Sequence, residues 1–422
     1  MIGIATTALR ATVLLLLCAC SVAGDDRAKR EQAFDRVWQH LDENFYDEGF
    51  RGRDWRALAA AYRPRALEAP SDEAFYAEMN GMLFELGVSH IAVIPDDHPE
   101  WIGAPSAFAN GEVGLDIRLI EGQFVVVDRD VRLGEREPEL RPGAIVRELN
   151  GLSVDDFLAE VRSPPVSAVP EPMAVTERAA RELFADPGSS VRIVYLGPDD
   201  SEREADLPAF ERGSAITLLE GIPPVYADFE SRVFEERVGY IRFNSFHPAL
   251  LDRIVDAIER FDDLPALIFD LRGNVGGDFN VRRTLAERLI RKRTVVWRYR
   301  GRRGTDEVVL DPHADAYDGS VVFLVDELSA SSAEELSGAM QALGRARVVG
   351  NRTAGLVLVA DTLRLEIGAT LIFPVAETSF VNGYVPEGKG IVPDEQVPWD
   401  RASLLDGRDR QLEFALELLL DE

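Results

Sequence analysis

Three serine residues stand where a strand of buried type gives way to a helix. The apolar run 321–325 is followed by Ser329, Ser331 and Ser332, and the segment after them has apolar residues at helical spacing. A serine in the first turn of a helix lies at the positive end of the helix dipole, which favours a nucleophile that develops negative charge. The same position is the usual place of an N-cap, so such a serine can also be purely structural. Its surroundings must decide between the two interpretations.

Two adjacent glycines mark a second junction of the same kind. The block 270–277, Asp-Leu-Arg-Gly-Asn-Val-Gly-Gly, directly follows a buried-type strand and opens a helix that contains Leu285 and Leu289. Glycines here leave backbone N–H groups unobstructed at a helix N-terminus, which suits an oxyanion or a phosphate. A tight turn between strand and helix explains them about as well. An oxyanion-hole role for Gly276 or Gly277 is therefore indicated only if a nucleophile lies nearby.

A serine nucleophile needs a base, and lysine is scarce in this chain. Of the 46 Lys and Arg residues only three are lysines, and the chain has five histidines; the lysines are Lys29, Lys292 and Lys389. An imidazole with an ordinary pKa of about 6.5 accepts a proton at neutral pH without the strong desolvation that a lysine base requires. The scarcity of lysine therefore bears directly on which base such a serine could use.

The overall composition excludes several classes of protein. The chain is 46% hydrophobic and 28% charged, with 33 Gly and 23 Pro. These values exclude a disordered, collagen-like or multi-spanning membrane protein. A net charge of −28 opposes contacts with phosphates, so nucleic acid is not an expected partner. At roughly 150 residues per domain, the 422 residues predict about three domains.

The first residues have the pattern of a bacterial secretion signal. Residues 1–24 combine a basic n-region, a short apolar h-region that ends at Leu17, and a small-residue cleavage site. This pattern indicates a secretory signal rather than a membrane span. The sequence Leu-Cys-Ala-Cys at 17–20 resembles a lipobox, in which the signal peptidase cuts before the cysteine that receives a lipid. Cys20 would become the lipidated first residue.

The lipobox has consequences for location and for cysteine chemistry. We expect a signal peptide over 1–19, a tether over 20–30 and a protein held by its lipid on the periplasmic side of the cell envelope, with membrane contact only through that anchor. Ordinary cleavage near Ala23 is the alternative. Both cysteines lie in the leader, so the folded part is expected to have no disulfide, no cysteine nucleophile and no thiolate metal site.

The hydrophobic periodicity divides the rest of the chain into three units. Residues 31–104 have apolar positions at helical spacing, 105–212 have strand-type runs separated by turns, and 213–422 alternate strands with helices. The near-continuous apolar runs of the last unit are typical of strands buried on both faces. The expected fold class is α+β multidomain, with a helical N-terminal domain, a β domain and an α/β core.

Four blocks of the last unit resemble, in order, the C-terminal processing (tail-specific) peptidases and the tricorn core proteases. The family's blocks read DLRgNgGG, SASsaEifagAlq, gRarvvGe.TaG and dG...EgkGi.PD, and they match residues 270–277, 329–341, 344–355 and 383–394. The resemblance extends over nearly all of the mature chain. It implies a ClpP/crotonase-like α/β peptidase core, a peptide or protein substrate, and a serine mechanism without metal or organic cofactor.

The resemblance also implies roles for individual residues. Ser331 would be the nucleophile, His90 the general base, Glu387 the acceptor that orients the base, and Ser89 the fourth member of a tetrad, as in the tricorn proteases. The oxyanion hole would combine a backbone N–H of one glycine with that of the residue after the nucleophile; the implied donors are Gly276 or Gly277, and Ser332.

The base assigned to the serine differs between the two branches of the family. The processing peptidases have a lysine directly after the third block, but here that residue is Leu356, so the Ser/Lys dyad is missing. Lys389 lies in the fourth block and is expected to be a solvated loop residue. The segment 86–91, Leu-Gly-Val-Ser-His-Ile, resembles the LgdsHt block of the tricorn-type branch, which moves the prediction to His90.

The β domain resembles a PDZ domain. Residues 140–151 are similar to the PDZ pattern glrpGDiIl.iNG. The implied carboxylate-binding loop, where backbone N–H groups and an open strand edge capture a peptide C-terminus, contains Gly114, Leu115, Asp116 and Ile117. The loop lacks the usual first glycine, and residues 163–186 are inserted. A generic β-sandwich insert is the alternative.

The leading hypothesis is a lipid-anchored envelope serine peptidase that works through an acyl-enzyme. The main alternative is a catalytically inactive binding protein on the same scaffold, because loss of the lysine also fits degeneration; a histidine retained beside Ser89 argues against it. Acyl-CoA chemistry on the related crotonase fold is a third hypothesis, weakened by the lack of a basic patch for a nucleotide phosphate. The sequence predicts no oligomeric state.

Overall fold

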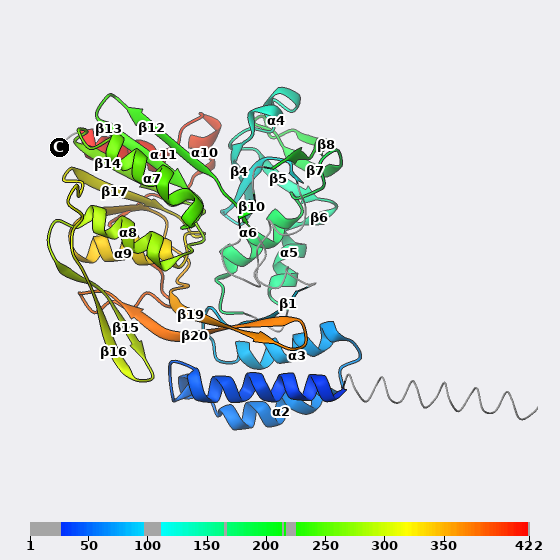
Figure 1. Cartoon of the computed structure of the whole chain (residues 1–422). Coiled ribbons are helices and arrows are strands. Elements are labelled where there is room, and N and C mark those ends of the chain that lie inside the picture. The colour runs from blue at the N-terminus through cyan, green and yellow to red at the C-terminus, as the bar shows by residue number, and fades with distance from the viewer. Residues whose placement is uncertain (1–26, 97–110, 164–166, 213–214, 217–224, 421–422) are drawn as a thin grey trace, which may run out of the picture.

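The computed structural model describes residues 27–96, 111–163, 167–212, 215–216 and 225–420. Its helices and strands are mixed, and they form units around separate hydrophobic cores (Figure 1). The predicted α+β multidomain class is therefore confirmed. Within the described ranges no helix is both long and apolar enough to cross a membrane. The predicted signal peptide and Cys20 lie outside the described residues.

The N-terminal unit is a layer of helices packed on a sheet from the C-terminal part of the chain. Asp54 and Ser71 each accept an N–H from three residues further on and cap two of these helices. Buried side chains such as Phe75 share one core with Leu371 of the sheet. The elements are a helix over 27–44, η1 (Phe50–Gly52), α2 (Trp55–Leu67), α3 (Asp72–Phe84) and β1 (Ala92–Pro95).

Strand β1 joins the N-terminal unit to that sheet. It pairs antiparallel with β20 (Ala369–Ser379), with Val93 opposite Leu371. The sheet order is β1-β20-β15-β16, and β19 also pairs with β20. The further strands are β15 (Thr294–Gly301), β16 (Gly304–Leu310) and β19 (Leu358–Leu365). This pairing holds Ser89 and His90, which directly precede β1, close to the part of the chain around β20.

The second unit, residues 111–212, is called the insert here. An antiparallel sheet in the order β3-β4-β5-β7-β8, with β6 beside β5, forms its centre, and β2 pairs with β9. The strands are β2 (Gly111–Glu112), β3 (Leu115–Ile120), β4 (Gln123–Arg129), β5 (Ile145–Leu149), β6 (Leu152–Ser153), β7 (Ser190–Leu196), β8 (Glu202–Pro208) and β9 (Phe210–Glu211). The strand-type runs expected in this unit are therefore present as strands.

Three helices of the insert were not expected from the sequence. They are α4 (Val131–Arg136), α5 (Val154–Val161) and α6 (Glu171–Arg181). Each has few turns, so its apolar positions are too few to give a clear period, and the cores they join are formed mainly by strands. Helix α6 falls in the inserted segment 163–186 and packs beside β3.

The third unit is built on a six-stranded sheet in the order β12-β13-β14-β17-β18-β21. All neighbours are parallel except the edge strand β12. One core on this sheet includes side chains of α7, α8 and α9, and a separate core includes those of α11. Helices therefore cover both faces, as the apolar strands predicted.

The elements of the third unit are β12 (Phe229–Phe234), β13 (Val238–Phe243), α7 (Pro248–Arg260), β14 (Ala266–Asp270), α8 (Phe279–Leu289), β17 (Ser320–Val325), α9 (Ser332–Ala342), β18 (Arg347–Gly350), β21 (Glu395–Gln396), α10 (Arg401–Leu405) and α11 (Arg410–Leu420). A short ribbon of β10 (Ala215–Ile216) and β11 (Val225–Tyr226) precedes them.

The topology brings the two strand-to-helix junctions together. Strands β14 and β17 are parallel neighbours, with Phe269 opposite Phe323. Their carboxyl ends therefore leave the sheet at the same edge, where ligands bind in sheets of this kind. The blocks 270–277 and 326–331 follow these ends directly, so they lie side by side.

The C-terminal segment ties the insert to the third unit. Arg401 Nε donates to the carbonyl oxygen of Gly143 at 2.8 Å, and Arg141 Nη1 donates to that of Leu405 at 2.7 Å. Leu404 of α10 is buried in a small core with Ile145 of the insert. Figure 1 shows α10 between the insert and the third unit.

Candidate active site

The structure separates the three serines of the second block. Ser329 Oγ is buried and donates to the carbonyl oxygen of Leu271 at 2.7 Å, and Ser332 Oγ donates to that of Gly277 at 2.8 Å. Ser331 instead lines a cleft of about 1180 Å³ to which all three units contribute. Ser331 is therefore the serine whose side chain a substrate in this cleft can meet.

Ser331 has an unusual backbone conformation. It is the N-cap of α9, with φ 53° and ψ −118°. A positive φ is unfavourable for a residue with a Cβ, and such strain is concentrated at functional sites. The Ser331 N–H donates to the carbonyl oxygen of Leu356 at 3.0 Å and to Glu334 Oε2 at 3.2 Å. These bonds hold the strained residue at the positive end of the helix.

Gly276 lies directly against the nucleophile loop. A Cβ added to Gly276 would be 2.6 Å from Ser331 Cβ and 2.8 Å from Ser332 N. Contacts this short admit only glycine. The Gly276 N–H already donates to Asn274 Oδ1 at 2.9 Å. For the N–H of Gly277, the described residues provide no acceptor.

His90 lines the same cleft, and a chain of hydrogen bonds leads from it into the protein. Its Nδ1 is 2.8 Å from Ser89 Oγ, which in turn donates to Glu387 Oε2 at 2.9 Å. Glu387 also accepts the N–H groups of Ser89 and Val357, both at 2.8 Å. Ser89 therefore stands between the imidazole and the carboxylate. These three residues are called the relay below.

The electrostatics of the relay follow from its burial. Burial lowers the pKa of His90 to about 4, so the ring is neutral at pH 7. Burial raises the pKa of Glu387, while the N–H groups of Val357 and Ser89 partly lower it. A neutral imidazole that is linked through Ser89 to a hydrogen-bonded carboxylate can act as a general base.

Leu356 occupies the position after the third block where a lysine base would stand. Its carbonyl oxygen accepts the Ser331 N–H, and its side chain lines the cleft. The position is therefore adjacent to Ser331 but apolar. Lys389 Nζ lies 5.7 Å from the centre of the Tyr384 ring and is not among the residues that line this cleft.

Glu334 is a site residue that the sequence analysis did not identify. It is fully buried and accepts hydrogen bonds from Gly355 N at 2.7 Å, from Leu356 N at 2.9 Å and from Ser331 N. Burial raises its pKa to about 7, and these hydrogen bonds oppose the rise. The pattern Ser-x-x-Glu at the start of a helix could have identified it, since a glutamate at this position commonly bonds back to the N-cap.

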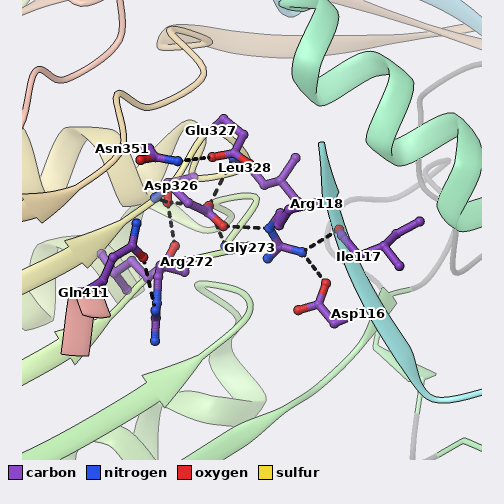
Figure 2. Close-up of polar contacts among 12 residues, drawn as sticks. Asp116, Ile117, Arg118, Arg272, Gly273, Asp326, Glu327, Leu328, Asn351 and Gln411 are labelled. Carbon is purple, nitrogen blue, oxygen red and sulfur yellow. Dashed lines mark hydrogen bonds and ion pairs between the residues drawn. The ribbon is translucent and has the colours of Figure 1, made fainter. Parts of the chain in front are cut away.

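A buried ion pair connects the insert to the nucleophile loop (Figure 2). Arg118 of β3 donates its Nε to Asp326 Oδ2 at 3.0 Å, and both side chains are almost completely buried. Asp326 Oδ1 accepts the N–H groups of Gly273 at 2.8 Å and Leu328 at 3.1 Å. One carboxylate therefore joins the glycine block, the nucleophile loop and the insert. Figure 2 shows Asp116 beside Arg118, with which it also pairs.

A second buried cluster supports the glycine block. Arg272 pairs with Asp270 and with Asp409 Oδ2 at 2.8 Å, and its Nη1 donates to Gln411 Oε1 at 3.1 Å. Asp409 and Gln411 come from the start of the C-terminal helix. The sequence offered no signal for either buried cluster, because charged residues at these spacings are usually solvated.

The residues predicted to bind a peptide lie on the wall of the same cleft. Gly114, Leu115 and Asp116 line it, and they stand at the start of β3. Among the strands that the structure describes, β3 pairs only with β4. Ile117 is buried in the core of the insert. No group of three or more His, Cys, Asp or Glu side chains that could hold a metal ion is found in the part of the chain that the structure describes.

Comparisons with known proteins agree with this geometry. The family model "Peptidase family S41" matches residues 237–397, and the model "Tricorn protease C1 domain" matches residues 26–84. A carboxyl-terminal-processing protease of Picosynechococcus sp. is 26% identical over 395 residues, which cover 92% of this chain and 88% of the relative. The putative tricorn protease homolog 2 of Streptomyces coelicolor is 26% identical over 412 residues, covering 94% of this chain and 33% of that protein.

Solved structures show the same fold. The photosystem II D1 C-terminal processing protease superposes with a TM-score of 0.59 at 21% identity, over 93% of this chain and 97% of that chain. Mature CPAF in complex with lactacystin superposes with a TM-score of 0.63 at 16% identity, over 93% and 97% of the two chains. The predicted recognition is confirmed: the match to peptidase family S41 over residues 237–397, the match to the tricorn C1 domain and the named relatives support a C-terminal processing or tricorn-type serine peptidase.

Proposed function

We propose that this peptidase cleaves polypeptides through an acyl-enzyme in which Ser331 is the nucleophile and His90 the general base. The observation that carries the proposal is the relay from His90 through Ser89 to Glu387, on a cleft that Ser331 also lines. The apolar residue Leu356 beside Ser331 supports a base other than lysine. Peptides and proteins are the substrates of the family.

The hydrogen bonds of the relay determine which imidazole nitrogen is basic. Glu387 can only accept when it is ionised, so Ser89 donates its O–H to Glu387 and its Oγ accepts from His90 Nδ1–H. The lone pair of the neutral ring is then on Nε2. In the proposed reaction Nε2 takes the proton of Ser331 as Oγ attacks the carbonyl carbon of the scissile bond.

The remaining steps use the same proton route. The protonated His90 gives its Nε2 proton to the amine that leaves, and the acyl group stays on Ser331 Oγ. A water molecule then loses a proton to Nε2 as it attacks the acyl carbon. Nε2 gives this proton to Ser331 Oγ as the ester C–O bond breaks, and the acid product leaves. Glu387 stabilises the imidazolium through Ser89 and stays ionised throughout.

We assign the oxyanion hole to backbone N–H groups beside Ser331. The Ser332 N–H is at the first position of α9, where N–H groups lack an acceptor within the helix. The Gly276 N–H is already bonded to Asn274, so we assign the second oxyanion donor to the Gly277 N–H. The role we assign to Gly276 is steric: without a Cβ, it lets the two segments of backbone pass close to each other at Ser331. The edge of β3 at Gly114–Ile117 is assigned to binding of the substrate chain.

Labelling with a fluorophosphonate tests the nucleophile. The probe is expected to label the mature protein, and Ser331→Ala is expected to abolish labelling, while Lys389→Ala leaves it unchanged. Labelling that survives Ser331→Ala contradicts the assignment of the nucleophile. Loss of labelling in Lys389→Ala would instead restore a Ser/Lys mechanism.

Leu356 also favours a second candidate function, an inactive peptidase-like binding protein of the envelope. An apolar residue beside the nucleophile is what loss of a lysine base would leave behind. The two candidates differ in turnover: the inactive protein binds peptides but neither reacts with the probe nor hydrolyses them. The intact relay around His90 makes the active peptidase the better supported of the two.

We further propose that Cys20 carries a lipid and that the enzyme acts on the periplasmic side of the cell envelope. The lipobox-like residues at 17–20 support this proposal. Expression with radiolabelled palmitate in a bacterial host is expected to label the wild-type protein in the membrane fraction. The variant Cys20→Ala is expected to lose the label; a labelled variant contradicts the anchor.

A further inference from the structure

Helix α6 presents one face to the active-site cleft. Met173 is buried in a small apolar cluster with Ala330, the neighbour of Ser331, and with Ala354. Glu177 and Arg181 follow Met173 at intervals of four residues, so the three side chains lie on one helix face. All three line the cleft. The helix therefore carries a carboxylate one turn beyond Met173, the residue that shares a cluster with Ala330.

Glu177 differs from its neighbours Glu160 and Glu182, because it makes neither a hydrogen bond nor a close ion pair with a described residue. The positive charge that acts on it is that of Arg181, one helical turn further on. Arg178, its neighbour in sequence, pairs with Glu160 at 2.5 Å and with Glu182 at 2.9 Å. Unpaired carboxylates are normally found on open surface, whereas Glu177 is half-buried in the cleft wall.

The surroundings of Glu177 favour a cation from outside the chain. Burial raises its pKa to about 8, and Arg181 offsets this rise only in part. A buried carboxylate becomes ionised when a cation or a hydrogen-bond donor arrives beside it. Because Glu177 faces the cleft, a substrate side chain can supply that group.

We propose that Glu177 selects a basic side chain, lysine or arginine, close to the scissile bond of the substrate. This inference rests on the proposed function, since it takes Ser331 as the point of cleavage. One helical turn is about 5.4 Å and an extended peptide advances about 3.3 Å per residue. The selected side chain is therefore expected within three residues of the scissile bond on either side.

A lysine scan of a peptide substrate tests the inference. A single lysine is placed in turn at each of the three positions before and after the scissile bond of a quenched fluorescent peptide, and norleucine replaces it in the matched series. The wild-type enzyme is expected to prefer lysine over norleucine at one position by about tenfold or more in kcat/KM, as a charge-assisted hydrogen bond gives.

Variants of Glu177 identify the residue responsible. Glu177→Gln is expected to remove the lysine preference and to leave turnover of the norleucine peptide unchanged. Glu177→Lys is expected to favour a glutamate at the selected position. The control is Glu160→Gln: Glu160 also lines the cleft, but it pairs with Arg178, which keeps Glu182 as a partner. This variant should retain the lysine preference.

The outcomes separate this inference from the proposed function. Absence of a lysine preference in the wild type, or a preference that Glu177→Gln does not change, overturns the role of Glu177. Failure of the fluorophosphonate to label Ser331 overturns the proposed function instead. Fluorescence anisotropy of the lysine and norleucine peptides on Ser331→Ala, with and without Glu177→Gln, then still decides whether Glu177 binds a cation, because it requires no turnover.

Discussion

The proposed nucleophile and the proposed base of this peptidase are held in opposite ways. Ser331 and Gly276 follow two neighbouring parallel strands, so the register of one sheet positions them. The relay instead joins Ser89 to Glu387, which are 298 positions apart, and takes a further N–H from Val357. The comparison teaches that the nucleophile depends on local sheet geometry, whereas the base depends on packing between units.

The largest effect is expected from removing the base itself. His90→Ala should lower kcat for a quenched fluorescent peptide by about 10³-fold to 10⁴-fold, since a general base contributes up to this amount. The nucleophile side should remain folded, because His90 contributes nothing to the core sheet. Lys389→Ala is the control, with kcat unchanged. A small loss in His90→Ala together with a large loss in Lys389→Ala would reverse the assignment of the base.

Gly276→Ala tests the nucleophile side of the comparison. The new Cβ would lie 2.6 Å from Ser331 Cβ, so the start of α9 must shift. A displacement of the nucleophile by about 1 Å should lower kcat by about 10²-fold. The control is Gly344→Ala, which has a similar left-handed φ of 64° but open space around the added Cβ. It should lower the melting temperature and leave kcat unchanged; equal kcat losses in both variants contradict the steric argument.

The pH dependence sharpens the description of the base side. His90 is neutral, and able to accept a proton, above its pKa of about 4. Activity should therefore be retained as the pH falls through 6.5 and be lost only nearer pH 4, measured as kcat/KM on the free enzyme. Glu387 is coupled to His90 through Ser89. The apparent pKa at which kcat/KM falls on the acidic side is therefore a property of the whole relay and not of one residue.

Glu387→Gln should move the acidic limb of this pH profile. Removing the negative charge disfavours the imidazolium, so the acidic limb shifts to lower pH while kcat falls by about 10-fold to 10²-fold. Asp361→Asn provides a control, because this carboxylate lies on β19 and makes no contact with the relay. An acidic limb near pH 6.5 in the wild type would show that His90 is more exposed to water than the structure indicates.

The smallest effect on kcat is expected at the link between the insert and the nucleophile loop. Arg118→Gln leaves Asp326 buried without its cation, which costs about 3 kcal/mol of folding stability. We expect a clear drop in melting temperature and a loss of a few-fold in kcat. In the double variant with Asp326→Asn part of the stability should return. If kcat falls as far as in His90→Ala, the insert contributes more to the active site than this contact implies.

The sequence predicted most of the candidate site where a residue type at a given position has only one or two known roles. The serine at a helix start, the missing lysine at Leu356 and the His90 block all pointed to residues that line one cleft. The glycine pair pointed to Gly276, which lies directly against Ser331. The fold class was predictable for a similar reason, because strands buried on both faces leave long apolar runs.

Other features could not be predicted because they depend on tertiary burial. Arg118, Asp326 and Glu177 resemble surface charges in the sequence, and only the assembled units show that they are enclosed. The helices of the insert were missed since short helices give weak periodicity. Glu334 is intermediate: its spacing from Ser331 was visible, but its bonds to Gly355 and Leu356 were not.

The pairing of β1 with β20 has a consequence for the order of events during synthesis. Contacts between the two ends of a chain have high contact order and form late in folding. A ribosome that has made the first half of this protein has made His90 but neither Ser331 nor Glu387. Under the proposed mechanism, hydrolytic competence therefore requires that the C-terminal region has emerged and folded back onto the N-terminal unit.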